Sequence, residues 1–191
     1  GNWPVVGPSP LPYSPTNQVP QQLDVAAMAA IRADFVACAP RAAAAGFDLL
    51  ELHCAHGYLL SSFLSPLTNH RTDEYGGPLA NRLRYPLEVF DALRDVWPNA
   101  APMSVRISAT DWYPGGTEAE DAVAIAQAFA EHGADAIDVS TGQVVKEERP
   151  AYGRSYQTPY ADRIANDVDI AVIAVGAISS AEDVNALILA G

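Results

Sequence analysis

The fold of this chain is decided by the stretch FDLLELHCAHGY, residues 47–58. It begins as a short apolar strand, and two imidazoles and a phenol collect where that strand ends. Side chains alternate between the two faces of an extended strand, so His53 and His56 would point to opposite sides if the strand continued. A turn after His53, which Gly57 permits, would bring both rings to one place. We therefore predict a functional site at the carboxyl end of a strand.

The arrangement of a strand followed by a helix recurs along the chain. We expect strands at Phe47–His53, Met103–Ser108, Ala136–Ser140 and Ile170–Val175. We expect helices at Leu23–Ala45, with a kink or a break at Pro40, and then at Pro86–Trp97, Glu118–His132, Tyr160–Ala165 and Ser180–Ala190. Four successive strand–helix units predict parallel strands with right-handed crossovers, hence a doubly wound sheet or part of a (β/α)8 barrel.

Polar side chains on the expected strands favour the barrel. A parallel strand that is covered on both faces should be apolar throughout, yet Arg106 alternates with apolar neighbours and so does Asp138. A barrel interior that carries a site explains this alternation better than a flat sheet does. Four units cannot close a ring of eight, and a full barrel typically needs about 250 residues. We predict an α/β fold, a partial TIM barrel of about four βα units with both ends of the barrel missing.

Composition and charge restrict the possible partners. The chain of 191 residues has 11 Lys and Arg against 23 Asp and Glu, a formal net charge of −12. Such an acidic balance argues against nucleic acid or an anionic membrane as a partner. Its two cysteines form no Cys-x-x-Cys pattern, and we find neither a signal peptide nor an apolar run that could span a bilayer. We interpret the chain as a reduced, cytoplasmic protein.

The chain divides by composition into two parts. Residues 1–22 are rich in proline without sustained periodicity, and we expect an irregular connection rather than a packed element. Residues 23–191 hold the strand–helix units and are expected to form the partial barrel. Both ends of the sequence look cut, so we interpret it as a piece of a longer chain.

The residue types at the first strand's end leave several roles open. His53 and His56 could bind a substrate oxygen, ligate a metal or be structural histidines, and a metal would need further ligands. Tyr58 could be a general acid or a phenol packed beneath the turn at 59–60. Cys54 is interpreted as an inert, half-buried thiol, because nothing else in the sequence supports a nucleophile.

The later strands present two further candidates. Arg106 could bind an anionic group or pair with Asp138 on the adjacent strand. Gly176 lies between a strand and a helix, where backbone N–H groups could bind a phosphate, although a tight turn also favours glycine. The long polar loop 142–158 could be a lid that contacts the substrate, or a solvated loop.

The run from Gly46 to Arg82 (GFDLLELHCAHGYLLSSFLSPLTNHRTDEYGGPLANR) resembles the signature of the old yellow enzyme family, which are FMN-dependent (β/α)8 oxidoreductases. The resemblance continues through the later strands and covers nearly the whole chain from about Leu23. The His-x-x-His form resembles the bacterial branch. The residues around Cys54 and the loop to Gln157 are most similar to the reductase-like domain of bifunctional salicylyl-CoA 5-hydroxylases.

The resemblance implies a reaction and roles for three side chains. The family moves hydride from NADH or NADPH through FMN to the C=C bond of an α,β-unsaturated carbonyl compound, for which a CoA thioester is one candidate here. His53 and His56 would bind the carbonyl oxygen, on which negative charge builds during hydride transfer. Tyr58 would protonate the α-carbon.

The resemblance also implies how FMN would be bound. Arg106 would lie at the N1/O2 edge of the flavin, and Gly176 and Ala177 would give backbone N–H groups to the phosphate. The strands that complete this site in the family are outside the sequence. A segment of this length alone is therefore expected to bind FMN weakly and to expose a barrel edge that favours association, with a homo-oligomer as one form. The alternatives are a non-catalytic half-barrel stable only through association and a metal-dependent hydrolase, although we predict no metal site.

Overall fold

The computed structural model describes residues 3–190 of the chain. The first two residues of the expected Pro-rich connection and the last residue of the expected barrel segment lie outside the described residues. Strands and helices alternate after a short pair of N-terminal strands. In chain order the elements are β1 (Val6–Gly7), β2 (Gln21–Gln22), α1 (Val25–Ala44), β3 (Leu50–Cys54), α2 (Leu59–Leu64), α3 (Leu79–Arg94), β4 (Met103–Ser108), α4 (Ala119–Glu131), β5 (Ala136–Ser140), α5 (Thr158–Asp167), β6 (Ala171–Ala174) and α6 (Ala181–Ala190).

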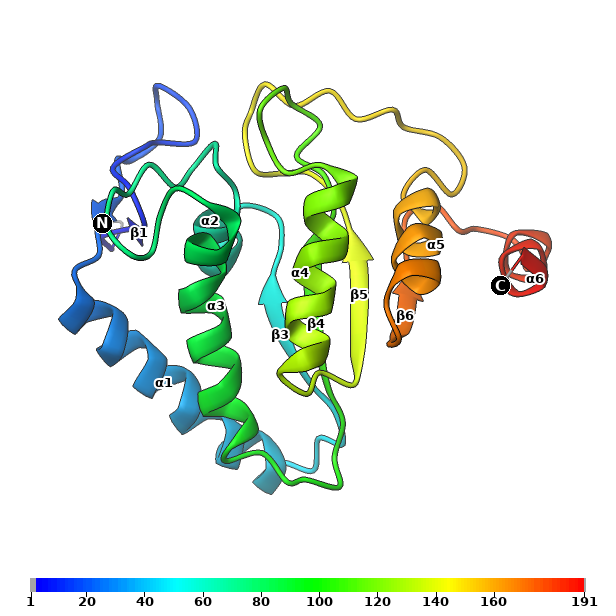
Figure 1. The fold of residues 1–191 in the computed structure, drawn as a ribbon, viewed down its shortest axis with the longest axis horizontal. Helices are drawn as coiled ribbons and strands as arrows, with labels where there is room; N and C mark the ends of the chain where they lie inside the picture. Colours follow the sequence, from blue (N-terminus) through cyan, green and yellow to red (C-terminus); the bar gives the residue numbers. More distant parts are fainter. Residues whose placement is uncertain (1–2, 191) are drawn as a thin grey trace.

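The main sheet has four parallel strands in the order β3-β4-β5-β6. Each strand pairs with the next strand of the chain, and α3, α4 and α5 lie along one face of the sheet (Figure 1). A doubly wound sheet reverses its strand order at a switch point, whereas an arc of a barrel does not. The predicted α/β fold, a partial TIM barrel, is therefore confirmed.

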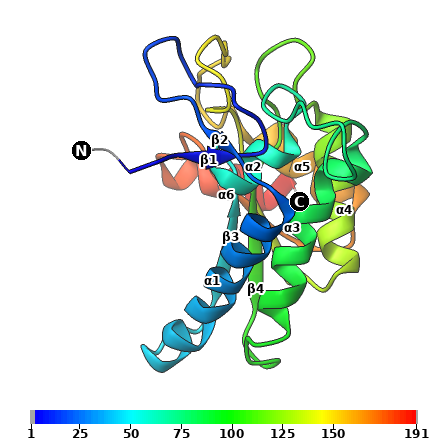
Figure 2. The same cartoon turned by 90° about the vertical axis from the view of Figure 1, so that its left-hand side faces the viewer.

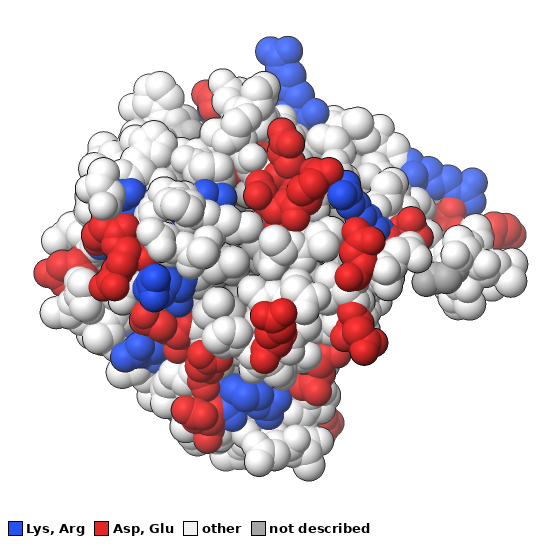
Figure 3. Space-filling model, in the orientation of Figure 1, with Lys and Arg blue, Asp and Glu red and all other residues white. Residues whose placement is uncertain are grey.

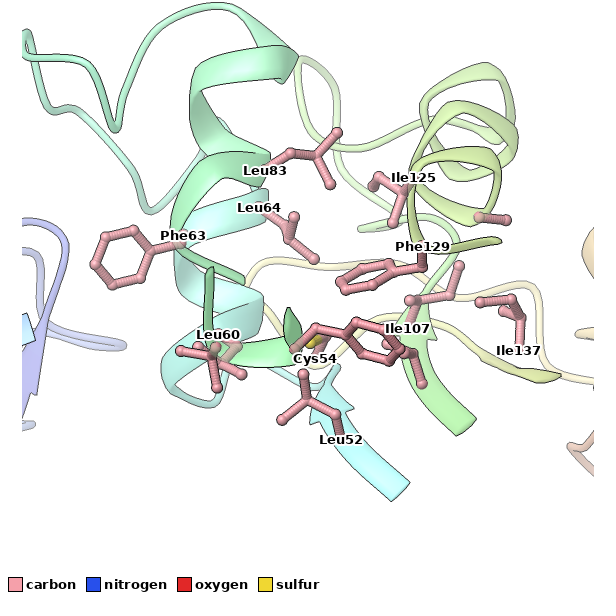
Figure 4. Packing of buried hydrophobic residues seen from close by; sticks show 14 of the residues in the cluster. Leu52, Cys54, Leu60, Phe63, Leu64, Leu83, Ile107, Ile125, Phe129 and Ile137 are labelled. Carbon is pink, nitrogen blue, oxygen red and sulfur yellow. The ribbon is translucent and has the colours of Figure 1, made fainter. Parts of the chain in front are cut away.

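The core fills the space between the sheet and its helices. The strands contribute Leu52, Ile107 and Ile137, which meet Ile125 and Phe129 of α4 (Figure 4). All five side chains are at most 2% exposed. Burial of each such side chain contributes roughly 1.5–3 kcal/mol, so the apolar alternate positions of the strands hold the helices on this face.

The other face of the sheet is polar. His53 of β3 lies opposite Arg106 of β4, and Arg106 lies opposite Asp138 of β5. One step nearer the carboxyl ends, Ser108 pairs in register with Ser140. Paired residues of neighbouring strands point to the same face, so the register gathers these polar groups on the side away from the helices.

The sequence predicted a kink or a break of the first helix at Pro40, and the break is wrong. Helix α1 runs through Pro40 without interruption to Ala44. The side chain of Asp24 caps its start by accepting a hydrogen bond from the backbone N–H of Ala27 at 2.7 Å. Packing on α3 supports it further along, where the hydroxyl of Tyr85 donates to the carbonyl of Met28 at 3.0 Å. These contacts outweigh the one hydrogen bond that a proline removes.

Helix α3 begins at Leu79 rather than at Pro86, where the sequence predicted its start. Pro86 is a buried interior residue of this helix. Polar contacts hold the first turns, because the buried guanidinium of Arg82 donates to the carbonyls of Leu64 at 2.7 Å and Gly77 at 2.6 Å. The short helix α2 was not predicted either. None of the helices within residues 3–190 combines the length and the apolar character needed to cross a membrane.

The N-terminal segment is more closely attached than the sequence suggested. Strands β1 and β2 pair in parallel over two residues each, and the buried hydroxyl of Ser9 accepts a hydrogen bond from the backbone N–H of His70 at 2.8 Å. Figure 2 shows this segment at the end of the sheet where the loops after the strands gather. These contacts tie part of the segment to the rest of the chain, while the expected irregular connection at residues 1–22 and the division at residues 22 and 23 stay predictions.

Candidate active site

The backbone turns sharply where β3 ends. His56 and Gly57 both adopt left-handed conformations, with φ of 62° and 69°. The backbone N–H of His56 donates to the hydroxyl of Ser108 at 2.9 Å, which ties the turn to β4. A Cβ on Gly57 would lie 2.7 Å from the carbonyl oxygen of Gln143, so the loop after β5 approaches the turn too closely for any other residue. The turn is thus fixed by its two neighbouring strands.

This turn brings three rings together. The ring centroids of His53 and His56 are 5.2 Å apart, and those of His53 and Tyr58 are also 5.2 Å apart. The side chain of Tyr58 is 64% exposed and precedes α2, so it is not packed beneath the turn at residues 59–60. Two imidazoles and a phenol therefore share one open site at the carboxyl end of β3.

Each imidazole is held through one of its two ring nitrogens. Nδ1 of His53 accepts the backbone N–H of Ala55 at 3.3 Å, which places the proton of the neutral ring on Nε2. Nε2 of His56 lies 2.7 Å from the hydroxyl of Ser140 on β5. One nitrogen of each ring is thus left for another partner: Nε2 of His53 and Nδ1 of His56.

Both histidines are neutral at neutral pH. Burial lowers the pKa of His56 to about 4, with further lowering by the positive charge of Arg106 and by His53. Burial and Arg106 also lower the pKa of His53, against the opposing effect of Glu51. Since neither ring is charged, each acts as a hydrogen-bond donor of one N–H rather than as a cation.

Ser140 belongs to a small network that the sequence did not indicate. Its hydroxyl lies 3.3 Å from Oε1 of Gln157, and the same oxygen accepts a hydrogen bond from Thr141 at 2.5 Å. Gln157 is buried just before α5. The available signal was the position of Ser140, two residues after Asp138 and thus on the same face of β5.

Arg106 pairs with Asp138 across the sheet, as one reading of the sequence proposed. Nη1 of Arg106 is 3.1 Å from Oδ2 of Asp138. Among residues 3–190, however, Nε of Arg106 and Oδ1 of Asp138 are buried without a hydrogen-bond partner. A buried donor without a partner is costly. The Arg106 side chain as a whole is 31% exposed, so its guanidinium can still meet an anionic or electron-rich group on the polar face.

Gly176 and Ala177 follow β6, two strands away from Arg106. Their φ angles are 98° and 53°, and both line a hollow of about 470 Å³ between this turn and α6. The next amides toward α6, those of Ser179 and Ser180, already donate to Oδ2 of Asp183 at 3.0 Å each. A phosphate at this turn would therefore depend on the amides of Gly176 and Ala177.

A groove of about 910 Å³ reaches the ring cluster at Tyr58. Tyr58 forms part of its wall, together with Tyr13 of the N-terminal segment and Val144 of the loop after β5. The loop 142–158 is thus a wall of the groove at one end, while Arg154 near its other end pairs with Asp183 of α6. The groove gives a small molecule access to the phenol of Tyr58.

Two alternative chemistries find little support in this site. Cys54 is 1% exposed, and burial raises the pKa of its thiol, so it does not form the reactive thiolate at neutral pH. Within the described residues, no three His, Cys, Asp or Glu side chains gather in a way that could hold a metal ion. The carboxylate of Glu51, on the face of His53, instead accepts a hydrogen bond from Ser104 at 2.8 Å.

An arc of parallel strands with polar groups at their carboxyl ends is the arrangement in which barrel enzymes place their active sites. Comparison with known proteins gives the family: the chain belongs to the NADH:flavin oxidoreductase / NADH oxidase family, whose model matches residues 5–190. It is 44% identical over 176 residues to an NADPH dehydrogenase of Geobacillus sp., covering 92% of this chain and 51% of that protein. It is 42% identical over 178 residues to an NADPH dehydrogenase of Listeria innocua, with 93% and 52% covered.

Solved structures agree with the fold. Morphinone reductase in complex with tetrahydroNAD superposes with a TM-score of 0.78 at 25% identity, covering 97% of this chain and 53% of that one. The old yellow enzyme homologue from Zymomonas mobilis gives a TM-score of 0.81 at 22% identity, with 99% and 55% covered. The chain spans about half the length of the curated relatives it matches. Family membership supports FMN as cofactor with NADH or NADPH as reductant, as the resemblance implied.

Proposed function

We propose that this chain supplies the substrate-binding side of a flavin-dependent oxidoreductase barrel that reduces the activated C=C bond of an α,β-unsaturated carbonyl compound. The observation that carries the proposal is the cluster of two neutral imidazoles and an exposed phenol beside an open groove. Family membership supports the coarser statement, an oxidoreductase that uses flavin.

The residues present fit FMN. The chemistry that FMN supplies when bound is transfer of a hydride from N5 of the reduced ring to the β-carbon of the substrate. Arg106 would hold the electron-rich N1/O2 edge of the ring with the exposed part of its guanidinium, since its side chain is 31% exposed. Gly176 and Ala177 would donate their backbone N–H groups to the phosphate.

The two histidines would bind the substrate's carbonyl oxygen. Nε2–H of His53 is available because Nδ1 accepts the N–H of Ala55. Nδ1 of His56 can donate only when its Nε2 accepts the proton of the Ser140 hydroxyl, which would then turn from Oε1 of Gln157, 3.3 Å away, to the closer ring nitrogen at 2.7 Å. Two fixed donors aimed at one oxygen stabilise the negative charge that develops on it.

Tyr58 would complete the reaction by giving its phenolic proton to the α-carbon. Its hydroxyl can recover the proton from water, because the side chain is mostly exposed and lines the groove. A general acid in such a position contributes typically about 10²- to 10⁴-fold. The residues of the groove wall near Tyr58 include apolar groups such as Val144 and Val145, which suit the carbon skeleton of an enone.

The finer substrate assignment stays a prediction. The chain resembles the reductase-like domain of bifunctional salicylyl-CoA 5-hydroxylases, which points to a CoA thioester. The structure of a 2-naphthoyl-CoA reductase superposes with a TM-score of 0.87, but its identity of 21% supports a common fold and no shared substrate.

Tyr58→Phe tests the proposal in a complete barrel that contains this segment. We expect the step in which substrate oxidises the reduced flavin to slow by about 10²-fold or more, because the proton donor is lost. The step in which NADH or NADPH reduces the flavin should keep its rate. Rapid mixing with detection of flavin absorbance measures both steps.

Tyr113→Phe is the matched control, since Tyr113 is also an exposed tyrosine, 43% exposed, but lies outside the ring cluster. Both of its half-reactions should keep their wild-type rates. Equal slowing of both steps in Tyr58→Phe would remove Tyr58 from the role of proton donor. Failure of the wild-type barrel to bind FMN would remove the oxidoreductase proposal itself.

A further inference from the structure

The pair of Arg106 and Asp138 is the most buried charged pair on the polar face. The two residues are in register on adjacent strands, and their nearest charged atoms are 3.1 Å apart. The side chain of Asp138 is 7% exposed and that of Arg106 is 31% exposed. His53 lies opposite Arg106 on the other side, so the pair is one strand away from the ring cluster.

The ion pair with Asp138 leaves the Arg106 side chain partly exposed on the polar face. Asp138 engages Nη1, whereas Nε is buried without a partner in the described part of the chain. A carboxylate that grips one end of a guanidinium restricts the directions in which the remaining donors can point. The negative charge of Asp138 also offsets the positive charge of Arg106, which would otherwise interact strongly with nearby groups because the site is partly shielded from water.

We propose that Asp138 is a positioning residue that orients Arg106 toward the flavin and, by offsetting its charge, lowers the reduction potential of the bound FMN. This inference rests on the proposed function, because it requires FMN beside Arg106. Reduced flavin carries negative charge on the N1/O2 edge. The net charge of the pair therefore decides how strongly the protein favours the reduced over the oxidised ring.

Asp138→Asn in the FMN-loaded protein separates charge from shape. The amide keeps the size of the side chain and an acceptor oxygen but removes the negative charge. We expect the ratio of the affinities for reduced and oxidised FMN to rise on the order of tenfold, seen as a more positive midpoint potential in a spectroscopic redox titration. Asp138→Ala, which also removes the acceptor, should in addition weaken binding of oxidised FMN.

Glu51→Gln is the matched control. Glu51 is a second carboxylate on the same face, but it is bonded to Ser104 in the layer below the pair. Its neutralisation should leave the potential near that of the wild type. Asp138→Glu, which restores the charge, should return the potential toward the wild-type value.

Loss of one partner of a buried pair can destabilise a protein by about 3–5 kcal/mol. Should Asp138→Asn not fold, Asp138→Ser gives a smaller neutral side chain with the same expected rise in potential. An unchanged potential in a folded, FMN-loaded neutral variant would overturn the inference, and so would an equal rise in Glu51→Gln. These variants are compared in a complete barrel that contains this segment, and a complete wild-type barrel that binds no FMN would overturn the proposed function and this inference with it.

Discussion

Left-handed backbone conformations occur at the ends of both β3 and β6. Two of the residues concerned are glycines, Gly57 and Gly176, but His56 and Ala177 also have positive φ angles of 62° and 53°. Such conformations are uncommon for residues with a Cβ and are held by their surroundings. At both turns the neighbouring loop or side chain comes so close that the turn cannot relax, which places the candidate catalytic and phosphate-binding groups.

Gly176→Ala is expected to lower the free energy of unfolding by about 1–3 kcal/mol. Its φ of 98° disfavours a side chain, and a Cβ would lie 2.3 Å from Nε2 of Gln157. Because Gln157 is buried and accepts a hydrogen bond from Thr141, moving it breaks a contact. Urea unfolding of the purified variant measures the change.

Gly153→Ala is the control for this substitution, because a Cβ there meets no atom within 4 Å. Gly153→Ala should change the free energy of unfolding by no more than about 0.5 kcal/mol. In a Gln157→Ala background the cost of Gly176→Ala should shrink, since only the backbone strain remains. Equal effects of Gly176→Ala and Gly153→Ala would contradict the proposed clash.

At the scale of elements, two helices contain an interior proline in different surroundings. Pro40 of α1 is exposed, whereas Pro86 of α3 is buried. Pro40→Ala is expected to raise the free energy of unfolding by about 1–3 kcal/mol, because it restores a backbone hydrogen bond and removes a steric clash. Pro86→Ala should raise the free energy of unfolding by less, because removing the buried proline ring also removes its packing contacts. Thermal or chemical unfolding of the two variants compares them. No gain from Pro40→Ala would contradict the expected cost of an interior proline in α1.

Two strands were predicted to the residue, whereas the strand predicted at Phe47–His53 begins only at Leu50. Met103–Ser108 and Ala136–Ser140 match their predicted bounds, because a polar inner face gives these strands a clear two-residue period. The start of α3 has no such signal, since polar side chains such as Arg82 and Arg84 satisfy the carbonyls of preceding loops. Helix α2 is too short to show the 3.6-residue apolar periodicity by which a helix is predicted.

The candidate site was predictable only in part. The sequence indicated the groups at the end of β3, because His53, His56 and Tyr58 are close along the chain. The contact between His56 and Ser140 joins residues 84 positions apart. It depends on the register of three strands, which a single sequence does not determine.

At the scale of the whole molecule, the helix-covered face and the edge beyond β6 differ in the side chains that they expose. Figure 3 shows Asp and Glu side chains scattered over the face that α3 and α4 cover. Beyond β6, α6 lies at the far end of the molecule from α1 (Figure 1) and carries two strongly exposed apolar side chains. Ile188 and Leu189 of α6 are 72% and 87% exposed. In a closed barrel each outer strand pairs with a further strand, so association of the segment alone is expected at this edge rather than on the acidic face.

The segment alone and a complete barrel that contains it should therefore behave differently toward FMN. After incubation with FMN and desalting, we expect the complete barrel to keep the visible absorption of the flavin and the 191-residue chain alone to lose most of it. Sedimentation velocity of the segment should show concentration-dependent association, which Ile188→Glu combined with Leu189→Glu reduces, because charges placed at an apolar edge disfavour its burial. Circular dichroism of the same samples checks that the segment is folded. Tight retention of FMN by the monomeric segment would show that β3–β6 alone make a sufficient flavin site. No flavin in either form would instead favour a non-catalytic half-barrel whose stability depends on association.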